Sequence, residues 1–296
     1  MFYTLTLNPA LDYVVKTDGL RLGETNRSNK SEIQLGGKGL NVSYVLGQLG
    51  VPSIALGFVA GFTGNELERL ATTSGIKTDF VHLSGGMTRI NVKLKGDTET
   101  EINTLGPTVS DVELDELFSK LDALQNGDTL VMAGSIPPSL PNDIYEKIMQ
   151  RLYGKGVRFV VDASKDVLLN TLKYKPLLIK PNLAELCDTV GKDLNSEAEI
   201  VTAARFLQTK GALNVLVSMG EKGAILVDSR GFEHKAPARQ LTPVNTVGAG
   251  DSMVAGFLKG LEHGHESALR LAIAAASATA ASKDLATKAE IEYFLH

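Results

Sequence analysis

The residues best suited to chemistry lie in the late segment Asn245-Thr246-Val247-Gly248-Ala249-Gly250-Asp251-Ser252. A glycine-rich turn here runs directly into the apolar residues 253–257, a pattern that predicts a helix start. Glycine lets backbone N–H groups approach an anion, and a helix N-terminus adds partial positive charge. Gly248, Ala249 and Gly250 could therefore form an anion hole for a phosphoryl group in transfer.

Asp251 follows the anion-hole glycines and lies in the first turn of the predicted helix. Its carboxylate could accept the proton of an attacking hydroxyl. Because a helix N-terminus favours the ionised carboxylate, we expect Asp251 to be a weak base. A purely structural alternative is that Asp251 caps a tight turn. The spacing of the residues leaves both interpretations open.

A second glycine-rich segment, Gly36-Gly37-Lys38-Gly39-Leu40-Asn41, also leads into a helical pattern. Its paired glycines permit close backbone approach, Lys38 supplies a point charge, and Asn41 can hydrogen-bond the hydroxyls of a sugar. The segment is not a P-loop, because glycine rather than Ser or Thr follows the lysine. It is not a dinucleotide-binding turn either, because Val42 stands where that motif needs glycine, which argues against an NAD-dependent oxidoreductase.

Three more residues could bind the hydroxyls of a polyol or a phosphate group. Asp12 follows the first predicted strand and could bind two hydroxyls, although a turn-capping role fits it equally. Arg89 opens a second alternating segment and suits bidentate capture of a phosphate, and Arg27 lies in an earlier insertion. Period two places the polar residues after Arg89 on one strand face, where we expect Lys95 to be solvated.

Two segments could serve a nucleotide. In Lys180-Pro181-Asn182-Leu183-Ala184-Glu185, the Asn and Glu are neighbours on one helical turn and could position phosphate and hydrated Mg²⁺, with a helix-capping box as the alternative. The segment Ser218-Met219-Gly220-Glu221-Lys222-Gly223 could cradle phosphates, although a plain hairpin turn is the simpler interpretation.

Short apolar runs alternate with helix-period segments through most of the chain, which predicts a doubly wound α/β fold with a mostly parallel sheet. We expect strands at 4–7, 53–59, 129–133, 158–162, 177–179, 215–218 and 224–227. We expect helices at 40–49, 66–74, 112–124, 143–152, 198–210 and 252–262, and a buried helix around 271–281. Insertions at about 13–34 and 88–103, the second with a turn at Gly96-Asp97, are predicted to pair as a small β lid.

The composition excludes several classes of function. The 296 residues are 43% hydrophobic and 22% charged, with a net charge of -4 and no Trp, which disfavours nonspecific binding to nucleic acid or anionic membranes. The start of the chain lacks signal-peptide features, and no apolar stretch reaches the roughly 20 residues of a membrane span. With the single cysteine Cys187, this favours one cytoplasmic domain over 1–296, and the five histidines do not cluster as a metal site.

The motifs at 36–41 and 245–251, with K-P-N-x-x-E between them, resemble the signature motifs of the ribokinase-like (PfkB) carbohydrate kinases. The resemblance covers essentially the whole chain. Within that family, T-L-N-P-A-L-D at 6–12 and T-R-I-N-V-K-L-K at 88–95 are similar to the bacterial 1-phosphofructokinases, with tagatose-6-phosphate kinases as close neighbours. The resemblance implies a ribokinase-like fold and transfer of a phosphoryl group from ATP to a ketose phosphate. Fructose 1-phosphate is the first candidate substrate and tagatose 6-phosphate is the alternative. A non-catalytic sugar-phosphate sensor is a further alternative, which the intact Asp251 and its glycine loop disfavour.

The resemblance also implies roles for individual residues. Asp251 would be the catalytic base beside the 248–250 anion hole. The sugar would contact Asp12, Gly37, Lys38, Asn41 and, from A-G-S-I-P-P at 133–138, Ser135, while Arg89, helped by Arg27, would hold its phosphate. Asn182 and Glu185 would serve Mg²⁺ and nucleotide phosphate, Ser218 and Gly220 would lie along ATP, and the protein would form a homodimer through the lid.

Overall fold

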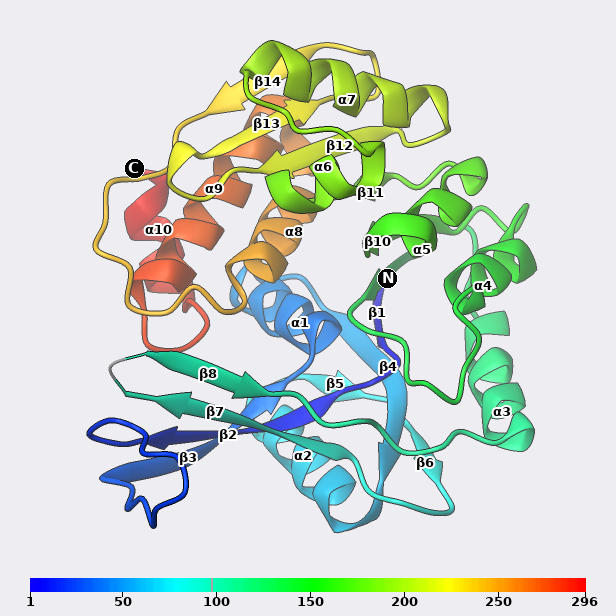
Figure 1. Ribbon diagram of the computed structural model, residues 1–296. Helices are drawn as coiled ribbons and strands as arrows, with labels where there is room; N and C mark the ends of the chain where they lie inside the picture. The colour runs from blue at the N-terminus through cyan, green and yellow to red at the C-terminus, as the bar shows by residue number, and fades with distance from the viewer. Residues whose placement is uncertain (97) are drawn as a thin grey trace.

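The computed structural model describes residues 1–96 and 98–296, which fold into a large twisted sheet with helices on both faces and a small separate sheet (Figure 1). The main sheet has the order β14-β13-β12-β11-β10-β9-β1-β4-β5, and β6 pairs with β4. Neighbouring strands are parallel except for the two antiparallel pairs β12–β13 and β13–β14. The strands are β1 (Phe2–Thr6), β4 (Ser53–Ala60), β5 (Lys77–Thr78), β6 (Val81–Leu83), β9 (Thr129–Ala133), β10 (Arg158–Asp162), β11 (Leu178–Ile179), β12 (Asn214–Ser218), β13 (Ala224–Val227) and β14 (Glu233–Ala236).

The strand order reverses at β1, which lies between β4 on one side and β9 on the other. In open parallel sheets, ligands bind in the crevice outside the carboxyl ends of the strands at such a reversal. The predicted mostly parallel, doubly wound sheet is confirmed, and its topology places a ligand site beyond the ends of β1, β9 and β10.

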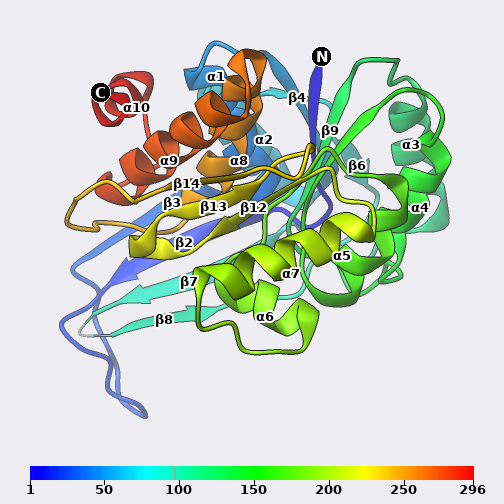
Figure 2. The same cartoon turned by 90° about the horizontal axis from the view of Figure 1, so that it is seen from above.

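Two layers of helices cover the sheet, because its central strands are apolar on both faces. Val131 of β9 packs into the core under α1 and α8, whereas its neighbour Met132 packs into the core under α3 and α4. Figure 2 shows α9 and α7 on opposite sides of β12 and β13. One layer is α1 (Lys38–Gln48), α8 (Ala249–Gly260), α9 (His265–Ala281) and α10 (Lys288–Leu295); the other is α3 (Asp111–Asp122), α4 (Ile144–Leu152), α5 (Lys165–Thr171), α6 (Leu183–Val190) and α7 (Glu197–Thr209).

The small sheet contains the strands β2 (Ala10–Lys16), β3 (Lys30–Gly36), β7 (Arg89–Lys95) and β8 (Glu99–Ile102) in the order β3-β2-β7-β8. The antiparallel hairpins β2–β3 and β7–β8 join through a parallel β2–β7 pair, as predicted for the lid. The lid starts at Ala10 rather than near 13, so Asp12 lies within a lid strand and does not end β1. Asp97 of the expected turn lies outside the described residues.

The sequence predicts that the polar face of the second lid hairpin is solvated, but much of this face is buried in the structure. Asn91 and Lys93, on the polar face, are buried, whereas Lys95 keeps 30% of its side chain exposed and pairs with Glu99. On the apolar face, Leu11 and Ile90 pack on α2 (Gly61–Thr73). Further out on that face, Tyr13, Ile33 and Ile102 are 38%, 51% and 53% exposed. The expected solvation therefore holds for Lys95 but is wrong for the polar face as a whole.

In the described part of the chain, no helix is both long and apolar enough to cross a bilayer.

Candidate active site

A cavity of about 680 Å³ lies at the carboxyl edge of the main sheet, and the lid forms its opposite wall. The sheet side contributes residues that follow β1, β9, β10, β11 and β12, and the lid contributes Asp12, Arg89, Asn91 and Lys93. A second cavity of about 630 Å³, lined by the β12–β13 turn, residues 238–243 and the helices α8 and α9, shares Asn182, Ser218 and Gly250 with the first. The shared residues mark the junction where two substrates could meet.

Gly248 and α8 form one side of this junction. Gly248 is the N-cap of α8, and its φ of 80° is in the left-handed region that favours glycine. A Cβ added there would clash with the side chain of Leu285, which would have to move. The first turn of a helix leaves backbone N–H groups without intrahelical partners. Gly248 and Gly250 line the first cavity and Ala249 lines the second, as an anion hole between two substrates requires.

Asp251 lies in the first turn of α8 with only 5% of its surface exposed, and it lines the first cavity. Its Oδ2 accepts a hydrogen bond from Nδ2 of Asn41 at 2.8 Å, which joins the two glycine-rich segments. No side chain caps α8, so the turn-capping interpretation of Asp251 is wrong.

Burial raises the pKa of Asp251 to about 7, and the nearby charge of Asp162 adds to the rise. The Asn41 hydrogen bond and the two ammonium groups of Lys38 and Lys180 oppose it only in part. The expectation that Asp251 is a weak base is therefore wrong, because desolvation is the largest cause acting on its pKa and raises it. A carboxyl group with this pKa can gain or lose a proton near neutral pH.

Asp162 is a site residue that the sequence analysis missed. It ends β10 and is 2% exposed, with Nζ of Lys38 at 3.2 Å from Oδ2 and Nζ of Lys180 at 3.5 Å from Oδ1. Burial opposes its charge, but the two lysines hold the pKa of Asp162 below its usual range. In return, Asp162 raises the pKa of Lys38 although burial lowers it. The signal available in the sequence was a carboxylate at the end of a buried parallel strand.

Asp12 is held by the lid. Its Oδ1 accepts a hydrogen bond from Nδ2 of Asn91 at 2.9 Å, and its Oδ2 lies 2.9 Å from Nζ of Lys93. Gly36 makes room for it, because a Cβ there would approach Asp12 Oδ1 to 2.8 Å. The turn-capping alternative for Asp12 is wrong, and sequence reasoning did not assign Asn91 or Lys93 to the site. Gly37 lines the same cavity.

Arg89 sits where β1, the lid and the loop after β9 meet. Its guanidinium donates to the backbone oxygens of Asn8 at 3.1 Å and Thr104 at 3.3 Å, and it lies 3.5 Å from Oγ of Ser135. Partial burial lowers the pKa of Arg89. Arg89 and Ser135, which were predicted separately as site residues, thus lie together. Arg27 is exposed between β2 and β3 and lines neither cavity.

Asn182 and Glu185 form the N-terminal capping box of α6, with both reciprocal hydrogen bonds at 2.8 Å. The structural alternative is confirmed, yet both side chains also line the cavity. Across residues 1–96 and 98–296, no three His, Cys, Asp or Glu residues cluster as a metal site. This donor set fits Mg²⁺ only if the ion keeps its waters and binds mainly through nucleotide phosphates, with Glu185 at its edge.

The turn Gly220–Lys222 joins the antiparallel strands β12 and β13, so the hairpin interpretation of this segment is confirmed. Gly220 of this turn and the nearby Ser218 and Gly223 nevertheless line the second cavity, where a nucleotide could lie.

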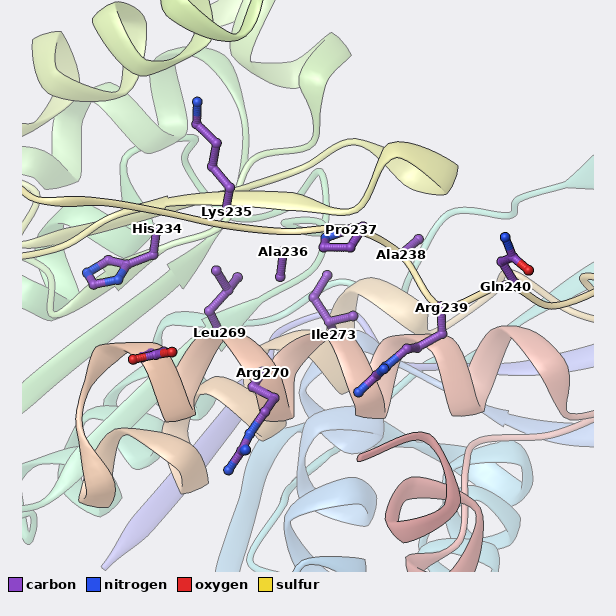
Figure 3. A pocket seen from close by; sticks show the side chains of 11 residues that line it. His234, Lys235, Ala236, Pro237, Ala238, Arg239, Gln240, Leu269, Arg270 and Ile273 are labelled. Carbon is purple, nitrogen blue, oxygen red and sulfur yellow. The ribbon is translucent and has the colours of Figure 1, made fainter. Parts of the chain in front are cut away.

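A third hollow, of about 550 Å³, lies between β14 and α9 (Figure 3). Arg239 and Arg270 extend beside it, and His234 lies at its other end. None of its residues lines the cavity that contains Asp251. It adjoins the second cavity, however, because the two share the residues Ala238, Arg239, Gln240 and Ile273.

The chain is similar to known proteins over its full length. The chain is 43% identical to a 1-phosphofructokinase of Bacillus subtilis, over 100% of this chain and 97% of the relative, and 38% identical to a D-tagatose-1-phosphate kinase of Bacillus licheniformis, over 99% and 96%. The solved structure of phosphofructokinase-2 from Escherichia coli in complex with substrates and products superposes with a TM-score of 0.94 at 27% identity, over 99% of this chain and 98% of that one. The model of the pfkB family carbohydrate kinases matches residues 6–292. The chain belongs to the pfkB family of carbohydrate kinases.

Proposed function

We propose that the protein transfers the γ-phosphoryl group of ATP to the free primary hydroxyl of fructose 1-phosphate, giving fructose 1,6-bisphosphate and ADP. The observation that carries this proposal is the buried Asp251 beside Gly248 and Gly250, at the junction of a polar cavity and a more apolar one. The full-length similarity to a protein named 1-phosphofructokinase supports the choice of sugar.

In the proposed reaction, the sugar occupies the 680 Å³ cavity and ATP the 630 Å³ cavity. Asp251 takes the hydroxyl proton as the C6 oxygen bonds to the γ-phosphorus and the bond from that phosphorus to the β–γ bridging oxygen breaks. The backbone N–H groups at the start of α8 stabilise the negative charge of the transferred phosphoryl group, as in an oxyanion hole. Mg²⁺, when bound, supplies positive charge to the nucleotide phosphates.

The remaining site residues serve binding. Asp12, held by Asn91 and Lys93, accepts hydrogen bonds from hydroxyls of the sugar, and Asn41 orients Asp251. Arg89 takes the phosphate already present, because its guanidinium is fixed at the cavity wall beside Ser135. Ser218, Gly220 and Gly223 lie along the nucleotide, with Asn182, Glu185 and Lys180 near its phosphates.

The similarity to a D-tagatose-1-phosphate kinase favours one second candidate, the same transfer to tagatose 1-phosphate. Tagatose 6-phosphate, the alternative drawn from sequence, carries its phosphate at the opposite end and would need that phosphate at Arg89 with its C1 hydroxyl at Asp251. A catalytically silent sensor is disfavoured, because a sensor could lose the buried Asp251 and the glycine turn at the start of α8, and both are present.

The test is an ADP-release assay with Mg·ATP and a panel of fructose 1-phosphate, fructose 6-phosphate, tagatose 1-phosphate, tagatose 6-phosphate and ribose. We expect the highest kcat/KM for fructose 1-phosphate. Activity on ribose alone would refute a phosphosugar kinase, and ATP and sugar binding without turnover would favour the sensor.

We also propose a single kinase domain over 1–296, located in the cytoplasm, that forms a homodimer through the lid. The apolar lid face supports the dimer, because Tyr13, Ile33 and Ile102 leave an exposed apolar patch on a sheet. Ile33→Lys with Ile102→Glu should convert a dimer into a monomer in light scattering, and a monomeric wild-type protein would contradict it.

A further inference from the structure

Lys93 is a buried cation to which sequence reasoning gave no role. It lies on β7 with 7% of its surface exposed, and it lines the sugar-side cavity. Its Nζ lies 2.9 Å from Oδ2 of Asp12 and 3.8 Å from Oε1 of Glu101 on β8. A lysine is rarely buried unless it is paired, so this position is strongly determined by its two carboxylate partners.

Lys95 provides an internal comparison. It lies two residues further along β7 on the same face, but it pairs with Glu99, is 30% exposed and does not line the cavity. The two lysines thus have the same strand, face and type of partner. They differ in burial and in contact with Asp12.

The geometry around Asp12 shows what Lys93 does there. Asn91 holds Oδ1 and Lys93 holds Oδ2, so the carboxylate is fixed from both sides by lid residues. Each carboxylate oxygen has a second lone pair that can accept a further hydrogen bond. A carboxylate oriented in this way can accept from two neighbouring hydroxyls of one sugar. Lys93 also lies between Asp12 and Glu101 and separates their like charges.

We propose that Lys93 is a sugar-positioning residue that fixes the Asp12 carboxylate toward the hydroxyls of the ketose and, through Glu101, ties this contact to the β7–β8 hairpin of the lid. This inference rests on the proposed kinase function and adds a determinant of sugar binding to it. Lys93 acts through Asp12, so it is distinct from the phosphate contact at Arg89. Strand β7 would then contribute to binding at both ends of the substrate: Arg89 binds the phosphate, and Lys93 positions Asp12 for the hydroxyls.

The first experiment compares Lys93→Met with Lys95→Met, each measured for KM of fructose 1-phosphate, KM of ATP and kcat. Loss of a charge-assisted contact to a buried carboxylate should raise the sugar KM about 10- to 100-fold for Lys93→Met. The KM of ATP should stay within about 2-fold, and Lys95→Met should match the wild type in both. A rise of equal size in the KM of sugar and of ATP would overturn the proposal.

The second experiment separates positioning from general structural damage. If Lys93 acts through Asp12, the double variant Asp12→Asn/Lys93→Met should lose no more sugar affinity than Asp12→Asn alone. The double variant also leaves no unpaired buried charge, so this comparison stands even if Lys93→Met does not fold. A further loss of about 10-fold in the double variant would contradict action through Asp12.

The two proposals fail in different ways. Wild-type protein that phosphorylates no ketose phosphate would refute the proposed function. Active wild-type protein in which Lys93→Met behaves as Lys95→Met would refute the role of Lys93 and leave the proposed function intact.

Discussion

Replacing Asp251 by Asn should remove activity and stabilise the protein at the same time. Asn has nearly the shape of Asp, and its amide oxygen can still accept the hydrogen bond that Asn41 donates at 2.8 Å. It cannot ionise or accept the proton of a hydroxyl. The substitution therefore isolates the ionisation of Asp251 from its packing.

The effect on stability follows from the raised pKa. An exposed Asp has a pKa of about 3.9, whereas burial and Asp162 raise that of Asp251 to about 7. The folded state therefore binds the proton more tightly, and stability falls as pH rises from about 4 to about 7. A difference of about three pK units corresponds to at most about 4 kcal/mol above pH 7. Asp251→Asn should recover part of that energy at pH 8 and none of it at pH 4.

The assays are urea unfolding at pH 5 and pH 8 and steady-state turnover at pH 8. Loss of a general base should lower kcat by about 10²- to 10⁴-fold, while the sugar still binds. The stability gain of the variant should be larger at pH 8 than at pH 5. A variant less stable than wild type at pH 8, or one with near-normal kcat, would refute the reasoning about Asp251.

Three further predictions concern Asp162, Arg89 and Mg²⁺. Asp162→Asn removes a negative charge that raises the pKa of Asp251, so the acid limb of the kcat profile should move to lower pH; an unmoved limb would contradict that coupling. Arg89→Ala should raise the KM of fructose 1-phosphate about 10- to 100-fold and leave the KM of ATP nearly unchanged. Equal effects on both substrates would count against a phosphate clamp. Chelation of Mg²⁺ should stop turnover without lowering the melting temperature, because residues 1–96 and 98–296 hold no three-residue metal cluster; a large thermal shift would show a structural metal.

Much of the fold could be predicted from local pattern. The predicted strands 129–133, 158–162 and 224–227 match β9, β10 and β13 at both ends, because short apolar runs buried on both faces are distinctive. Less could be predicted where tertiary contacts determine the bounds or the existence of an element. The helix expected at 66–74 begins at Gly61, and the edge strand β14, E-H-K-A, has no apolar run to mark it.

In the site, too, residues in local motifs could be predicted, whereas residues that depend on distant partners could not. Glycine turns that enter helices identified Gly248, Gly37 and Asp251, because that chemistry is local in sequence. Asp162 and Lys93 were missed, because their roles come from partners 124 and 81 residues away, Lys38 and Asp12. The raised pKa of Asp251 was also missed, since burial is a property of the folded state.

A crystal structure of the protein with fructose 1-phosphate and a non-hydrolysable ATP analogue tests the central claim most directly. We expect the C6 oxygen within about 2.6–3.2 Å of an Asp251 carboxylate oxygen, the sugar phosphate on Arg89 and the terminal nucleotide phosphate at the start of α8. A sugar bound with its free primary hydroxyl away from Asp251, or a nucleotide outside the cavity between residues 218–223 and α9, would contradict the account.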